Sequence, residues 1–359
     1  MHQPGFFDLP EHLKRLSEAG DPLEAMAVAI DFEAFRPVLD AALGYSDGAK
    51  GGRPPYDPVA MFKALILQAQ NTISDARMEF LIRDRLSWLR FLGFELGKAT
   101  PDANTIRMFR ERLTEAGAIR TLFDAFDRQL RDCGYLAMGG QLVDATLVQA
   151  PRQHNTAEEK AAIRDGKTAA EIWPDKPAKA RQKDTHARWT VKTSRVREGA
   201  DGKPLPALAI PIFGYKSHIV IDRRYGFVRA FKTTDAARHD GAVLREIVTR
   251  DNTASDVWAD TAYRSKANEA WLHRMGRVSR IHHRKPKGRP MPDRIAKANA
   301  ARSRVRATVE HVFAQQKDRM GLVIRTIGLK RAEARIGLAN LAYNLQRYLF
   351  HERRTPQAV

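Results

Sequence analysis

The sequence predicts an α/β protein, in which a mixed sheet with flanking helices is preceded by an all-α N-terminal domain. The apolar residues follow a helical period over residues 55–135 and change to the alternating period of a strand at residue 139. From there on, the pattern predicts a strand, a hairpin of two strands, a helix, two short strands and two helices. This order of elements is typical of layered α/β domains.

Capping residues mark the start of three predicted helices in the N-terminal part. Asp57 can cap a helix that has Pro58 in its first turn, and Ser74 can cap the next helix. Asp102 or Asn104 can cap a third helix, which has an apolar stripe along one side. The N-terminal part is therefore expected to fold as a helical bundle.

The third of these helices carries two arginines that are candidate DNA contacts. Arg107 and Arg110 lie away from its apolar stripe. They fit either the solvated face of a bundle or a helix that contacts the phosphates or a groove of DNA. The pattern alone leaves both interpretations open.

The second half begins with a strand over residues 139–148, in which Asp144 shares a face with Leu142, Thr146 and Val148. A right-handed crossover would place strand 255–260 parallel to this strand and beside it. The other expected elements are a hairpin of strands 213–222 and 227–233, a helix over 241–250 capped by Asp240, a strand at 278–283, a helix over 302–320 and a helix over about 330–350. Residues 150–187 are expected to form a polar excursion, and residues 284–301 a basic loop that prolines interrupt.

The charge of the chain points to a polyanionic partner. The 359 residues include 61 Lys and Arg against 42 Asp and Glu, a formal net charge of +19. Residues 1–50 have a net charge of −5, whereas residues 277–354 have a net charge of +15. A basic excess of this size favours nucleic acid as the partner, and it argues against an acidic small-molecule enzyme and against an intrinsically disordered tail.

Other classes of protein are disfavoured by simple features of the sequence. A single cysteine, Cys133, excludes a disulfide framework and paired-cysteine zinc sites, and it favours a reducing cytoplasm. No run of about 18 apolar residues is present, so no membrane-spanning helix is expected. The absence of a glycine-rich phosphate loop argues against a nucleotide cofactor.

Three carboxylates stand out in this basic chain. Asp144 interrupts an apolar strand and Asp260 ends another, so neighbouring strands would bring both into one cleft. Glu310 lies at the edge of an apolar helix stripe, within about 40° of Arg306 and Lys317 around the helix axis. Taken singly, each acid also fits a turn, a strand edge or an ordinary ion pair.

Carboxylates repel DNA phosphates unless a metal ion lies between them. Oxygen ligands of this kind suit Mg²⁺ or Mn²⁺. Two such ions about 3.5–4 Å apart can activate an attacking oxygen and stabilise a leaving oxygen in phosphoryl transfer. The three acids together therefore favour a metal-dependent reaction on DNA.

Three sequence blocks carry a resemblance to a known family. The blocks QLVDATLV, WADTAYRS and RVRATVEHVFAQQK resemble those of DDE-type insertion-sequence transposases of the IS-five group, and the resemblance covers about residues 50–350. It implies a ribonuclease-H-like catalytic domain with Asp144, Asp260 and Glu310 as its metal-binding triad. It also implies that Arg306 and Lys317 contact the DNA end. Ser303 stands where the family usually has a tyrosine.

The resemblance implies an organisation and partners for the whole chain. Residues 1–135 would form a helical DNA-binding or dimerisation domain, residues 136–350 the catalytic domain, and residues 351–359 a basic tail. The partner would be double-stranded DNA, at the element ends and at the target, in the bacterial cytoplasm near the nucleoid. Because two DNA ends must be paired, at least a homodimer is expected.

Further basic residues are candidate DNA contacts. Lys216 lies on a predicted strand, and the segment RKPKGRP contributes Arg284, Lys285 and Lys287. Two other interpretations of the chain stay open. It could be a catalytically silent DNA-binding protein, or a different ribonuclease-H-like nuclease that recognises DNA shape.

Overall fold

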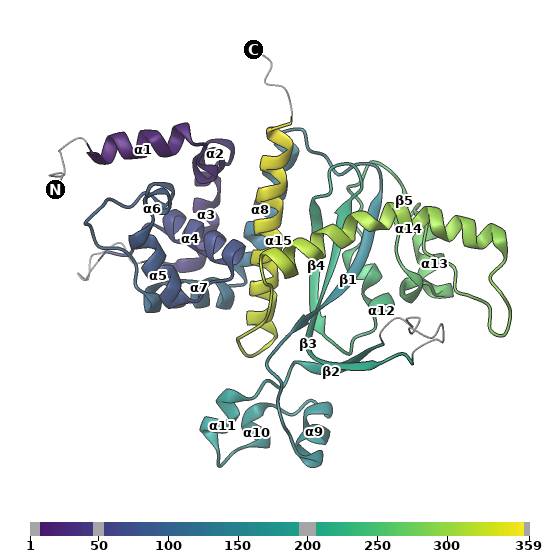
Figure 1. Ribbon diagram of the computed structural model, residues 1–359. Coiled ribbons are helices and arrows are strands. Elements are labelled where there is room, and N and C mark those ends of the chain that lie inside the picture. The colour runs from purple at the N-terminus through teal and green to yellow at the C-terminus, as the bar shows by residue number, and fades with distance from the viewer. Residues whose placement is uncertain (1–7, 46–53, 194–205, 355–359) are drawn as a thin grey trace. The chain divides into compact units, whose positions relative to one another are not determined.

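The computed structural model describes residues 8–45, 54–193 and 206–354 of the chain (Figure 1). These residues divide into two compact units. The first unit contains residues 8–135, 318–321 and 337–354, and the second contains residues 136–317 and 322–336. The last helix, α15 (Leu329–Glu352), therefore contributes its first turns to the second unit and the rest to the first.

All the regular secondary structure in the described residues of the first unit is helical. Eleven of the fourteen residues of its helix α4 are buried, so other helices cover α4 on nearly every side. At its centre, the rings of Phe35 and Phe62 lie 5.0 Å apart. The elements are α1 (Asp8–Glu18), α2 (Pro22–Ala29), η1 (Glu33–Phe35), α3 (Arg36–Leu43), α4 (Pro58–Asn71), α5 (Asp75–Asp84), α6 (Leu86–Leu92), α7 (Ala103–Glu115) and α8 (Ala118–Asp132).

The predicted caps of three helices are confirmed. Asp57 accepts a hydrogen bond from the backbone N–H of Ala60 at 2.8 Å, and Pro58 lies in the first turn of α4. Ser74 caps α5 in the same way. Of the two candidates for α7, Asp102 is the cap. Each side chain satisfies an N–H group that the first turn of a helix leaves unpaired.

A six-stranded mixed sheet forms the centre of the second unit. Its main path runs β2-β3-β1-β5-β6, and β4 pairs with β3. The predicted antiparallel hairpin is confirmed as β3–β4, and the predicted parallel pairing is confirmed between β1 and β5. The strands are β1 (Gln141–Gln149), β2 (Arg188–Thr193), β3 (Ala209–Asp222), β4 (Val228–Asp235), β5 (Asp256–Trp258) and β6 (Val278–Ser279).

Helices pack on both faces of this sheet. Helices α12 (Asp240–Ile247) and α13 (Lys266–Arg274) share an apolar cluster with Val143 of β1. Because neighbouring residues of a strand point to opposite faces, Asp144 lies on the other face, where α14 (Asp293–Ala314) contacts β1. Among the described residues, no helix has both the length and the apolar composition needed to span a bilayer.

The excursion between β1 and β2 contains regular structure that the sequence did not suggest. It forms three short helices, α9 (Ala157–Arg164), α10 (Ala169–Ile172) and α11 (Pro177–Gln182). Reciprocal bonds between Thr156 and Glu159, and between Thr168 and Glu171, begin the first two of these helices. These helices were not predicted because few of their residues are buried, so their sequences lack the apolar periodicity that indicates a helix.

Two further expectations about helix starts are wrong. Asp240 does not cap α12: it is the first helical residue, and the Nδ1 atom of His239 accepts the hydrogen bond from Gly241. Residues 284–301 are not all loop, because α14 begins at Asp293, directly after Pro292. Proline restricts the chain before a helix without preventing the helix that follows, and an acidic residue in the first turn stabilises it.

Candidate active site

Asp144 lies in the middle of β1 with its carboxylate largely buried. Its side chain is 15% exposed, and its Oδ1 atom accepts a hydrogen bond from the backbone N–H of Ala145 at 2.8 Å. Burial raises the pKa of Asp144, the positive charge of Arg306 opposes this rise, and the negative charge of Asp260 adds to it. The carboxylate therefore lies in an environment where a cation is strongly favoured.

Asp260 follows β5 at the position that corresponds to Asp144 on β1. The last paired residues of the two parallel strands are Leu142 and Trp258, and each aspartate lies two residues beyond its strand's paired residue. Because the strands are parallel neighbours, this equal offset puts both carboxylates at one edge of the pairing. The Oδ1 atom of Asp260 accepts a hydrogen bond from Ala262 at 2.7 Å, which fixes the carboxylate at the start of a short helix, η2 (Thr261–Tyr263).

Helix α14 brings an arginine to Asp144. A guanidinium nitrogen of Arg306 lies 2.7 Å from the Oδ2 atom of Asp144, and only 13% of the arginine side chain is exposed. The Nε atom of Arg306 is buried without a hydrogen-bond partner. The predicted DNA contact Arg306 thus neutralises the candidate catalytic carboxylate in this structure.

Glu310 lies one helical turn beyond Arg306 and is exposed. Within the described residues it forms no hydrogen bond and no ion pair. No three acidic, histidine or cysteine side chains of the described chain lie close enough together to hold a metal ion. The structure thus brings together Asp144 and Asp260, whereas Glu310 remains apart from them.

The pair of carboxylates fits a hard divalent cation. Asp144 and Asp260 supply oxygen ligands of the type that Mg²⁺ and Mn²⁺ prefer, and their mutual repulsion would be relieved by a cation between them. One ion would therefore find two protein ligands in this arrangement. In the described part of the chain, neither Glu310 nor any other acidic, histidine or cysteine side chain completes a three-ligand metal site with the two aspartates, so the second expected ion has no visible site.

The site also contains a tyrosine, Tyr263, that the sequence analysis had not singled out. Tyr263 is fully buried, and its hydroxyl has no hydrogen-bond partner. Burial raises its pKa well above the ordinary value, and the negative charges of Asp144, Asp240 and Asp260 add to the rise. The residue belongs to the block WADTAYRS, so its position beside Asp260 was the signal that could have identified it.

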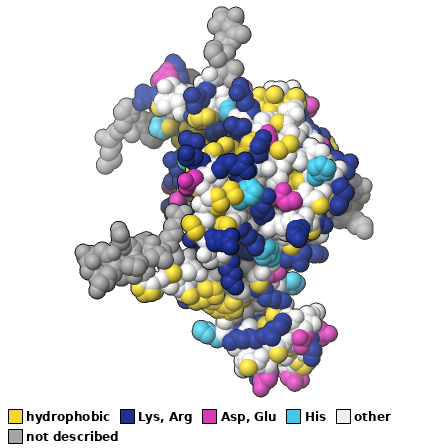
Figure 2. Space-filling model, turned by 90° about the vertical axis from the view of Figure 1, so that its right-hand side faces the viewer, with side chains coloured by type: hydrophobic (Ala, Val, Ile, Leu, Met, Phe, Trp, Pro, Cys, Tyr) yellow, Lys and Arg dark blue, Asp and Glu magenta, His cyan; other side chains and the backbone are white. Residues whose placement is uncertain are grey.

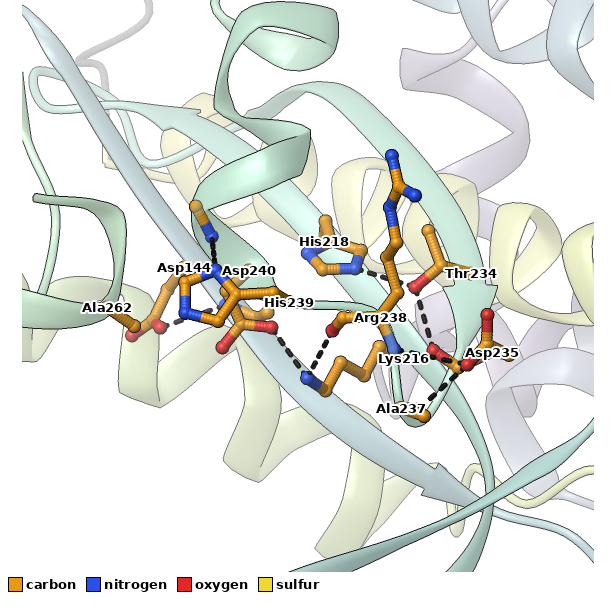
Figure 3. A network of polar contacts seen from close by, with 12 residues as sticks. Asp144, Lys216, His218, Thr234, Asp235, Ala237, Arg238, His239, Asp240 and Ala262 are labelled. Carbon is orange, nitrogen blue, oxygen red and sulfur yellow. Dashed lines mark hydrogen bonds and ion pairs between the residues drawn. The ribbon is translucent and has the colours of Figure 1, made fainter. Parts of the chain in front are cut away.

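Lys216 of β3 lies on the opposite face of the sheet from Asp144. Its ammonium group donates to the carbonyl of Arg238 at 2.7 Å and to Asp240 at 2.8 Å, and 14% of its side chain is exposed (Figure 3). These contacts hold the start of α12 against the sheet. The lysine that was expected to contact DNA is therefore engaged inside the protein.

The other predicted DNA contacts of the second unit are exposed. Arg284, Lys285 and Lys287 lie in the loop between β6 and α14, where Arg284 donates to the carbonyl of Thr261. Lys317 is exposed in a π-helical turn, η3 (Gln315–Arg319), at the end of α14. All four of these cations follow the two aspartates in the sequence, and all four are exposed.

The two arginines of α7 in the first unit differ from one another. Arg107 is exposed and donates to the side chain of Asn104. Arg110 forms two parallel hydrogen bonds with the carboxylate of Asp75, each 2.7 Å long, and donates a third to Gln68. Arg110 therefore joins α7 to α4 and α5, whereas Arg107 remains accessible to a ligand.

Comparison with known families gives two matches that together cover most of the chain. A family model described as a transposase domain (DUF772) matches residues 11–112. A second model, described as a transposase DDE domain, matches residues 136–345, and this match includes Asp144, Asp260 and Glu310. No solved structure matches the chain. The match to the DDE domain spans more than half of the sequence, and the mixed sheet with flanking helices agrees with the ribonuclease-H-like fold expected of it, so this chain belongs to the DDE family of insertion-sequence transposases.

Proposed function

We propose that this transposase cuts DNA at the ends of its insertion sequence and joins the ends to target DNA. Water attacks the phosphodiester at the element end, the bond to the 3′ oxygen breaks, and that oxygen takes up a proton. The new 3′-hydroxyl then loses its proton and attacks a phosphodiester of the target, whose 3′ oxygen leaves. Both steps are transfers of a phosphoryl group, so no covalent protein–DNA intermediate is required.

The observation that supports this proposal is the equal offset of Asp144 and Asp260 beyond the last paired residues of β1 and β5. Two carboxylates in register just beyond the paired residues of β1 and β5, within a chain of net charge +19, are difficult to explain by stability alone. Burying a carboxylate such as Asp144 costs free energy even when a cation pairs with it. A metal-dependent reaction at DNA phosphates would explain the arrangement, because it requires carboxylates as metal ligands.

We propose that Asp144 and Asp260 hold Mg²⁺ or Mn²⁺, with Glu310 as the third ligand of a two-ion centre. When bound, such ions lower the cost of the negative charge that develops on the attacking and leaving oxygens. The contact with Ala262 orients Asp260, and the contact with Ala145 orients Asp144. Arg306 neutralises Asp144 in this structure, so it would have to release Asp144 when a metal ion binds and could then contact a DNA phosphate.

The N-terminal and C-terminal parts of the chain would have different functions. We propose residues 1–135 as the domain for DNA binding and dimerisation, with Arg107 as an accessible contact, and residues 136–350 as the catalytic domain. A homodimer or larger assembly would hold two DNA ends. The basic tail, residues 351–359, is described only as far as residue 354, and the remainder lies outside the described residues.

A second candidate function is favoured by one observation. Arg306 covers Asp144, and Glu310 lies apart from the two aspartates. A chain fixed in this arrangement would bind DNA without cutting it. The candidate is then a catalytically silent DNA-binding protein, and the two functions differ in their dependence on the three acids.

Strand cleavage and joining on the DNA that flanks the gene tests the proposal. The purified protein is assayed with Mg²⁺ or Mn²⁺ beside the variants Asp144→Asn, Asp260→Asn and Glu310→Gln. We expect nicks at a repeated end sequence that need the metal, and their loss in all three variants with DNA binding retained. Asp293→Asn, which removes an exposed acid at the start of α14, is the matched control and should cut normally.

Two other results would change the assignment. Binding with no cleavage under any metal would favour the silent DNA-binding protein. Cleavage that survives Glu310→Gln would leave Asp144 and Asp260 as the essential pair and remove Glu310 from the centre.

A further inference from the structure

A pocket lined by arginines lies beside Asp260, at the first turns of α12 and α13. Its volume is about 560 Å³. Ala262, whose backbone N–H binds the carboxylate of Asp260, forms part of its wall. Three of its ten lining residues are arginines and none is acidic: His239, Gly241, Ala242, Arg245, Ala262, Arg264, Ser265, Ala267, Asn268 and Arg284.

The three arginines reach the pocket from different elements. Arg245 comes from α12, Arg264 from the segment between η2 and α13, and Arg284 from the loop after β6. Each is anchored by the protein: Arg245 donates to the side chain of Asn268 and Arg284 to the carbonyl of Thr261, while Arg264 donates to the carbonyl of Ile281 and forms an ion pair with Glu269 at 3.5 Å. Such anchoring positions a guanidinium and leaves further N–H groups for a ligand.

Positive charge accumulates around this pocket. Burial lowers the pKa of Arg302, and the positive charges of Arg264 and Arg280 lower it further. The pKa of His283 is lowered for the same reasons, by burial and by Arg264 and Arg302. Lysine and arginine side chains are abundant on the face that Figure 2 turns to the viewer. Cations that repel one another in this way are stabilised when an anion binds among them.

We propose that this pocket binds a phosphate group of the DNA backbone next to the phosphate that reacts. The inference rests on the proposed function, because it takes the DNA strand to pass Asp260. Arginine suits this ligand, since its planar fork donates two hydrogen bonds to a phosphate. Arg245 and Arg264 thereby become DNA contacts that their positions in the sequence did not suggest.

The pocket would act as a positioning site rather than a site of chemistry. A phosphate held there fixes the strand along its length, so that the neighbouring phosphodiester meets Asp144 and Asp260 in one register. Contacts of this kind carry no sequence information and depend strongly on salt. The proposal therefore makes its sharpest prediction for DNA binding, without any metal.

The test compares two double variants of the full chain in buffer with a chelator. Arg245→Gln/Arg284→Gln removes two exposed pocket charges. Arg250→Gln/Arg274→Gln removes two exposed charges near the other ends of α12 and α13, outside the pocket. Affinity for a duplex carrying the element end is measured over a range of salt. The pocket variant should lower the slope of log affinity against log salt by about 0.9, because one phosphate contact is lost.

A second measurement locates the phosphate. Neutral methylphosphonate linkages are introduced one at a time along the element end. One such linkage beside the cut should weaken binding of the wild-type protein and of the Arg250→Gln/Arg274→Gln control, but not of the pocket variant. An equal effect of every linkage on all proteins, or equal slopes for both double variants, would overturn the proposal.

Two further arms separate related possibilities. Inorganic phosphate at matched ionic strength should compete with DNA no better than chloride; stronger competition that is lost in the pocket variant would mean a site for free phosphate and would overturn the assignment to DNA. Cleavage with Mg²⁺ is assayed separately. If the effect of the methylphosphonate linkage is lost in the pocket variant but no cleavage is seen, the pocket is supported and the proposed function is rejected. If cleavage is seen but that effect is the same in all proteins, the pocket is rejected.

Discussion

The guanidinium of Arg306 lies 2.7 Å from Oδ2 of Asp144, although the two residues are 162 positions apart in the chain. Both side chains are largely buried, and Asp260 adds a second negative charge nearby. The arginine thus occupies the place beside Asp144 where a metal cation would be most favoured. This relationship makes the charge balance of the site depend on one residue of α14.

Removing Arg306 should destabilise the metal-free protein. Arg306→Met leaves a buried carboxylate without its partner, and we expect the free energy of unfolding to fall by roughly 3–5 kcal/mol. Urea unfolding in chelator measures this, with Arg304→Met, an exposed arginine on the same helix, as the control. The double variant with Asp144→Asn should lose less than the sum of the single losses; a strictly additive result would mean that the pair contributes little.

The same substitution should strengthen metal binding. If Arg306 and a divalent cation compete for Asp144, Arg306→Met should bind Mn²⁺ more tightly than the wild-type protein does in the absence of DNA. Titration followed by the paramagnetic signal of free Mn²⁺ measures the affinity. Asp144→Asn should abolish the gain. Weaker binding by Arg306→Met would show that the arginine supports the metal site instead of competing for it.

The centre of the fold was predictable because it follows from local rules. The alternation around Asp144 and the handedness of crossovers were enough to predict that β1 and β5 are parallel neighbours. Because Asp144 and Asp260 lie equally far beyond the paired residues of β1 and β5, their closeness follows from that pairing. Caps such as Asp57 and Ser74 depend only on residues within one turn of the helix.

Features that depend on distant contacts were not predictable. Arg306 and Glu310 differ by only about 40° around the helix axis, so the rotation of α14 decides which of them reaches the sheet. In this structure Arg306 does. The contact of Lys216 with Asp240 could not be predicted from local pattern, because the two residues are 24 positions apart in the chain.

The two arginines of α7 should behave differently when each is changed to glutamine. Arg110→Gln breaks the paired bonds to Asp75 and should lower the free energy of unfolding by about 1–2 kcal/mol. Arg107→Gln should leave unfolding unchanged and weaken DNA binding, because its side chain is exposed. Thermal unfolding and a DNA-binding assay on each variant measure both quantities. Normal DNA binding by Arg107→Gln would remove this helix from the proposed interface.

His218 should make the stability of the catalytic unit sensitive to acid. Its imidazole is fully buried in β3, where one ring nitrogen lies 2.9 Å from the hydroxyl of Thr234. Burial lowers its pKa from 6.5 to about 4, with Lys216 and Lys232 acting in the same direction and Asp240 and Glu246 opposing. The folded protein therefore resists a proton that the unfolded chain accepts readily.

The direction of the pH effect follows from this difference. Above pH 7 the imidazole is neutral in both states, and stability does not depend on it. As the pH falls from 6.5 toward 4, the unfolded chain binds the proton first, so the free energy of unfolding decreases, by roughly 3 kcal/mol at pH 4. Urea unfolding at several pH values, for wild type and His218→Gln, isolates this contribution from the carboxylates that titrate in the same range. Parallel profiles of the free energy of unfolding against pH for the two proteins would contradict the prediction, because they would show that the folded protein binds a proton at His218 as readily as the unfolded chain does.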